Sequence, residues 1–128
     1  MSEASNYLEN KVVDHTLGTA SYTAPTNVYT ALFTSDPTDA GTGTECSYTN
    51  YARQVTTFGA ASGGSASNSA DITFAAIVGA DVTITHFAIY DAASGGNLLY
   101  HSPVDTSKTY SADDIPSFAA SAITVSLD

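Results

Sequence analysis

The sequence predicts an all-β protein, an antiparallel β-sandwich of about seven strands with one short N-terminal α-helix. Segments rich in β-branched and aromatic residues recur along the chain, separated by clusters of Gly, Asp, Ser and Pro. Only 12% of the residues are charged and Trp is absent, so the polar surface must come mainly from Ser, Thr, Asn and Gly. At 128 residues the chain has the length of one domain, with a helix and arm over residues 1–20 and a sandwich over residues 25–128.

The predicted helix begins near the start of the chain. Asn6 is the expected N-cap, with Glu9 three residues later as in a variant capping box. Leu8 and Val12 share one side, and Gly18 stands where a helix C-terminus favours a left-handed residue. At about 11 residues, such a helix is marginal alone and must pack on its own sheet or on a neighbouring subunit.

The predicted strands follow Pro25. The strongest is 82–90, where Val82 and Ile84 share one face before the apolar residues change parity at Phe87. Either both faces are covered there or a β-bulge changes the register. The other expected strands are 28–33, 51–58, 71–74, 97–101, 106–110 and 122–127, with Lys108 protecting 106–110 as an edge. Residues 35–47 form an expected loop, and 59–70 an expected mobile hairpin connection.

Charge and cysteine content limit the partners. Three basic residues face thirteen acidic ones, giving a net charge of −10. Such a chain cannot form the Lys and Arg clusters that bind nucleic acid or an anionic membrane. Cys46 is the only cysteine, so no intramolecular disulfide is expected. The N-terminus lacks the pattern of a signal peptide and no apolar run is long enough to span a membrane, so we expect folding in a cytoplasm.

Sequence motifs for catalysis are missing. The acidic residues fall mainly in predicted turns, where Asp caps the local backbone. No serine lies in a Gly-x-Ser-x-Gly elbow, and no Gly-rich loop followed by Lys could hold a phosphate. We therefore expect no enzymatic activity and no cofactor.

Two groups of residues are weak metal candidates. His86 and His101 lie on strands expected to pair, so with a nearby Asp they could bind zinc, although ordinary strand positions are favoured. Asp36, Asp39 and Glu45 share one loop, but their spacing departs from the known calcium-loop pattern. No metal is therefore predicted, with calcium at the loop as the weak exception.

Eight tyrosines raise the question of binding. Exposed tyrosines can stack on sugars or anchor an interface, but most are expected to complete the core with their hydroxyls at its rim. Tyr48 and Tyr51, beside the long loop, are the strongest candidates for contact. The predicted interface residues are Leu8, Lys11, Val12, Tyr48, Tyr51 and Arg53.

Several segments together resemble a known family. They are 8–15 (LENKVVDH), 22–25 (YTAP), 28–34 (VYTALFT), 51–54 (YARQ), 58–61 (FGAA), 85–100 (THFAIYDAASGGNLLY) and 117–120 (SFAA). With these, the chain resembles small structural proteins of tailed bacteriophages, loosely labelled tail fibre or virion decoration proteins, over nearly its whole length. The resemblance implies a place in the virion without catalysis, and it transfers no catalytic residue.

Two positions on the virion compete. A fibre usually needs a repetitive shaft or an attachment domain, and the sequence shows neither. We therefore favour a capsid decoration protein that binds neighbouring copies of the major capsid protein through the helix or the 35–47 loop. Local three-fold positions of a capsid would suit a homotrimer. The alternative is a component of the tail fibre, tail tip or baseplate that contacts tail proteins and the host surface, including its glycans.

Overall fold

In the computed structural model, which describes residues 2–127, strands predominate and all pairings are antiparallel. The elements are β1 (Glu3–Ala4), α1 (Asn6–Thr16), β2 (Val28–Phe33), β3 (Gln54–Thr56), β4 (Ser65–Ser67), β5 (Ile72–Thr73), β6 (Val82–Tyr90), β7 (Leu98–Tyr110), β8 (Ser117–Phe118) and β9 (Thr124–Ser126). The predicted all-β class with one N-terminal helix is confirmed. Within the described part of the chain, no helix is long and apolar enough to cross a bilayer.

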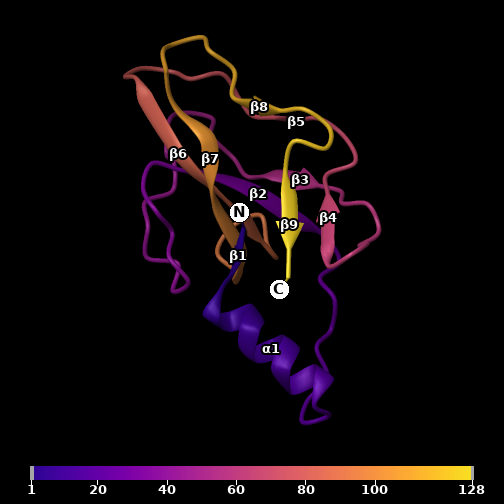
Figure 1. Cartoon of the computed structure of the whole chain (residues 1–128). Helices are drawn as coiled ribbons and strands as arrows, with labels where there is room; N and C mark the ends of the chain where they lie inside the picture. The colour runs from indigo at the N-terminus through magenta and orange to yellow at the C-terminus, as the bar shows by residue number, and fades with distance from the viewer. Residues whose placement is uncertain (1, 128) are drawn as a thin grey trace.

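The strands form one large sheet and two small ones. The large sheet has the order β1-β7-β6-β2-β3, and the small sheets pair β4 with β9 and β5 with β8 (Figure 1). Ile72 of β5 and Ile123 before β9 are buried in the same cluster as Leu32 and Phe87 of the large sheet. The layer facing the large sheet therefore consists of two short sheets and their connections.

Strand β6 carries apolar side chains on both faces. Ile84 and Phe87 belong to the main core, whereas Ala88 and Tyr90 belong to a second cluster. The pairing of β6 with β7 shifts register just after Ile84, which moves the core-facing positions from even to odd numbers. Both explanations offered by the sequence therefore hold.

The second cluster is covered by the loop between β2 and β3. Its buried members are Ala31, Phe33, Ala88, Tyr90 and Leu98. Pro37 of the loop is fully buried, and Gly41 lies against Leu98. This loop, purple in Figure 1, lies on the other side of the large sheet from β4, β5, β8 and β9.

Strand β7 is longer than the sequence predicted. Apart from Asn97, the expected segments 97–101 and 106–110 are parts of one strand of 13 residues. Pro103 lies within this strand, beside the irregularity in pairing with β6, where the missing N–H is tolerated. The segment 106–110 pairs with β6 only, so it is an edge as predicted.

The Gly- and Ser-rich segment 59–70 contains a strand that the sequence did not predict. It contains β4, whose three residues pair with β9. Asn68 directly follows β4 and is only 1% exposed. The bridges Phe58↔Asn68 and Ser62↔Ser65 make the segment a hairpin, as predicted, but nothing in the sequence indicated that it would also pair with β9.

The helix α1 is held at its N-terminal end. Ser5, not Asn6, is the N-cap: its hydroxyl accepts the Leu8 N–H and donates to the Leu98 carbonyl. Gly18 has φ +77°, the left-handed conformation predicted for the end of the helix. Among the strands α1 packs mainly on β7, and it projects beyond the sheet (Figure 1).

Candidate functional site

Three groups of residues carry the candidate functions: the helix α1, the tyrosines and Arg53 beside the 35–47 loop, and the histidines of β6 and β7. On the helix, Leu8 is buried in the core, Val12 is half-buried and Lys11 is exposed. The Lys11 ammonium lies 5.6 Å from the centroid of the Tyr7 ring. Of the three predicted interface residues on the helix, Lys11 is thus the one fully open to a partner.

The larger apolar exposure on α1 lies further along the helix. Val13 is 53% exposed and Leu17 is 76% exposed. A groove of about 1170 Å³ runs between this part of the helix, including Val13, and a wall formed by Gly64 and Leu127. Val13 and Leu17 are four residues apart, so they lie on one side of the helix. Their exposure among the described residues could not be read from this spacing.

Tyr48 and Tyr51 both use their hydroxyls in hydrogen bonds within the chain. The Tyr48 hydroxyl donates to the Ala75 carbonyl at 2.8 Å. The Tyr51 hydroxyl donates to Glu45 Oε2 at 2.7 Å and accepts the Leu32 N–H at 3.0 Å. Burial, together with the hydrogen bond to Glu45, raises the pKa of Tyr51 well above its ordinary value, and burial raises that of Tyr48 to about 12. Both hydroxyls therefore stabilise the fold through hydrogen bonds within the chain.

Arg53 joins three segments. Its Nε and Nη2 donate to the two oxygens of Glu45, both at 2.9 Å, in a bidentate ion pair. Its Nη1 donates to the carbonyls of Ala92 and Gly95 at the β6–β7 turn, at 3.0 and 2.8 Å. The guanidinium also lies 3.7 Å from the centroid of the Tyr90 ring. With its side chain only 9% exposed, this predicted interface residue offers little surface to a partner.

Cys46 lies next to this ion pair and is buried. Burial is the main cause that raises the pKa of its thiol to about 11. Because the folded chain holds this proton more tightly than the unfolded chain, the thiol stabilises the fold below the ordinary thiol pKa, and that contribution is lost as the pH rises towards 11.

We expect a disulfide reagent at about pH 8 to label Cys46 only after unfolding, because the native thiol is protonated and shielded. Labelling is followed by absorbance, with urea-unfolded protein as the control. Stoichiometric labelling of native protein at the rate of a free thiol would contradict the burial.

The acidic residues of the 35–47 loop, the weak calcium candidates, lie in two separate places. Glu45 pairs with Arg53, whereas Asp36 and Asp39 lie beside His101. Among the described residues, the group spaced to hold a cation is Glu3, Asp39 and His101. The calcium set Asp36, Asp39 and Glu45 is therefore not assembled.

His101 lies at the centre of a carboxylate cluster. It is on β7, its side chain is only 4% exposed, and its Nε2 is 2.8 Å from Asp39 Oδ1 and 3.7 Å from Glu3 Oε2. Its Nδ1 is 3.7 Å from Asp36 Oδ1, and the same oxygen is 4.0 Å from His86 Nε2. β6 and β7 pair as predicted, but Asp36 lies between the two histidines. The sequence could not reveal Glu3, because the pairing of β1 with β7 joins distant parts of the chain.

The fold and these sites define a small β-structured protein whose buried ionic groups join its segments. The family model described as podophage GP4 fiber I protein gp80 matches residues 3–126, so the chain belongs to this family of phage tail fibre proteins. It is a phage structural protein and a component of the virion. Comparison with curated proteins finds no match.

Proposed function

We propose that this chain is a non-enzymatic part of the tail fibre and that α1 attaches it to a neighbouring tail protein. The fibre position rests on the family match, which fits this alternative better than the capsid decoration that the sequence favoured. The expectation of a trimer came from the three-fold positions of a capsid, so a fibre position gives it no separate support.

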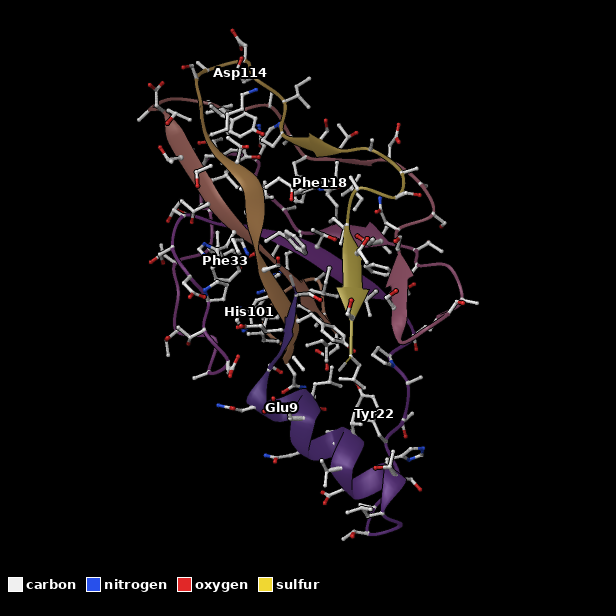
Figure 2. All side chains as sticks on the ribbon, in the orientation of Figure 1. Glu9, Tyr22, Phe33, His101, Asp114 and Phe118 are labelled. Atoms are coloured by element: carbon white, nitrogen blue, oxygen red, sulfur yellow. The ribbon has the colours of Figure 1, made fainter. Side chains whose placement is uncertain are left out.

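The observation that supports attachment through α1 is the exposure of this helix. Only Leu8 of the helix is buried, and the helix extends away from the sheet toward the end of the molecule opposite Asp114 (Figure 2). Val13 borders a groove next to the C-terminal segment, and Leu17, one turn further along the helix, is also exposed. A short helix with such residues gains stability by packing on a partner.

The experiment replaces Val13 and Leu17 with Gln, which keeps a helix-forming side chain and removes the apolar contact. We expect the double variant to fold with an unchanged melting temperature and to join particles about tenfold less efficiently, the loss typical of a central interface residue. Incorporation is measured by quantitative mass spectrometry of phage assembled with the variant in place of the wild-type chain.

The matched control is Ile115→Gln, because Ile115 is 56% exposed and directly follows Asp114, which lies at the end of the molecule opposite α1 (Figure 2). We expect this variant to be incorporated normally. If both variants and wild type were incorporated equally well, α1 would not be the element that attaches the chain. Deleting residues 1–18 is a poorer test because it removes β1 and the core residue Leu8.

A further inference from the structure

The cluster around His101 has the composition of a zinc site. Glu3 comes from β1, Asp39 from the 35–47 loop and His101 from β7. One ligand atom of each lies within 4.8 Å of those of the other two. Zinc bonds of about 2.0–2.2 Å place neighbouring ligand atoms roughly 3.3–3.6 Å apart in a tetrahedron, so small side-chain movements suffice.

A carboxylate lies near the second ring nitrogen of His101, as it does in many metal-binding histidines. With Nε2 directed at Glu3 and Asp39, Nδ1 faces Asp36 Oδ1 at 3.7 Å. At 3.7 Å these two atoms are too far apart for a hydrogen bond, and Nε2 is hydrogen-bonded with Asp39 instead. If zinc replaced that bond, a small movement would let Nδ1–H donate to Asp36, which would leave Nε2 free for the metal and make the ring a better ligand. Asp36 would thus orient His101 without touching the ion.

The charges also favour a cation. Three carboxylates, of Glu3, Asp36 and Asp39, surround a histidine whose side chain is 4% exposed. An imidazolium can offset one negative charge, whereas a divalent ion offsets two. The imidazole nitrogen selects zinc over calcium, which prefers oxygen ligands alone. We propose that Glu3, Asp39 and His101 bind a zinc ion, with Asp36 as the positioning residue.

The site would join the base of the helix to the body of the protein. Glu3 lies just before α1, and the Asp39 carbonyl accepts the N–H of Asn6, the first helical residue, at 3.1 Å. A bound ion would therefore link β1, the loop and β7 at the point where α1 leaves the sheet. The side chains of Glu3 and Asp39 are 69% and 46% exposed, which leaves a path for zinc and room for a water ligand.

Calorimetric titration of the chelator-treated full chain with zinc chloride tests the proposal. We expect one ion per chain, and a melting temperature raised by about 5–10 °C when free zinc is about 100-fold above Kd. Cobalt chloride should give the visible absorption of a low-symmetry site. The variants Glu3→Gln and Asp39→Asn should weaken zinc binding more than 10-fold, and Asp36→Asn by about 10- to 100-fold.

Asp105→Asn is the control, because Asp105 is an exposed acid on β7 outside the cluster. It should bind zinc as wild type does. Since Glu3 is largely exposed, Glu3→Gln should fold normally in chelator, which separates a lost ligand from a lost fold. No heat of binding, wild-type affinity in Glu3→Gln and Asp39→Asn, or equal stabilisation by calcium would each overturn the proposal.

Discussion

Replacing Arg53 with alanine is expected to lower the free energy of unfolding by about 3–5 kcal/mol. The substitution leaves the half-buried Glu45 carboxylate without its cation and frees the carbonyls of Ala92 and Gly95. It also removes the guanidinium from the face of Tyr90, which is buried. Urea unfolding followed by circular dichroism measures the change.

Arg53→Lys is the matched control, because it keeps the charge but cannot make the bidentate pair or reach the turn carbonyls as a planar group does. It should fall between wild type and Arg53→Ala. A double-mutant cycle with Glu45→Ala isolates the coupling of the pair. A loss below about 1 kcal/mol in Arg53→Ala would show that the pair behaves as an ordinary surface salt bridge.

Asn68→Ala is expected to cost about 2–4 kcal/mol, since each polar group left unpaired in the interior costs roughly 1–3 kcal/mol. The Asn68 side chain donates to the carbonyls of Ala70 and Ala119, at 2.8 and 2.9 Å, and accepts the Ile123 N–H at 2.8 Å. It therefore joins the end of β4 to the segment that leads into β9. Thermal and urea unfolding measure the loss.

Two further substitutions test this explanation. Asn68→Asp keeps the shape and the acceptor for Ile123 but cannot donate to the carbonyls, so it should destabilise at least as much as alanine. The neighbouring Ser69→Ala removes an exposed hydrogen bond to Thr57 and should change stability by less than about 0.5 kcal/mol. If Asn68→Ala matched Ser69→Ala, the side-chain bridge would not hold the two segments together.

Two of the three longest strands, β2 and β6, were predictable because their own residues determine them. The predicted bounds 28–33 and 82–90 are those of β2 and β6, which are rich in β-branched and aromatic residues. β4 has the sequence Ser-Ala-Ser and no strand propensity, so it forms only because β9 pairs with it. β1 and β8 have two residues each, too few for any periodic pattern.

In the candidate sites too, local features were predictable and contacts that depend on tertiary packing were not. The approach of His86 and His101 could be predicted, because it follows from one hairpin. The carboxylates that surround His101 come from β1 and from the fold of the 35–47 loop, and both depend on tertiary packing. Arg53 was predicted as an interface residue, but its role depends on where Glu45 and the β6–β7 turn lie.

Cryo-electron microscopy of the intact phage particle tests the central claim most directly. We expect density for this domain in the fibres attached to the tail, with α1 against a neighbouring tail protein. Density repeated over the capsid surface would contradict the fibre position and restore capsid decoration. Density in the fibres with α1 facing solvent would keep the position and reject the helix as the attachment.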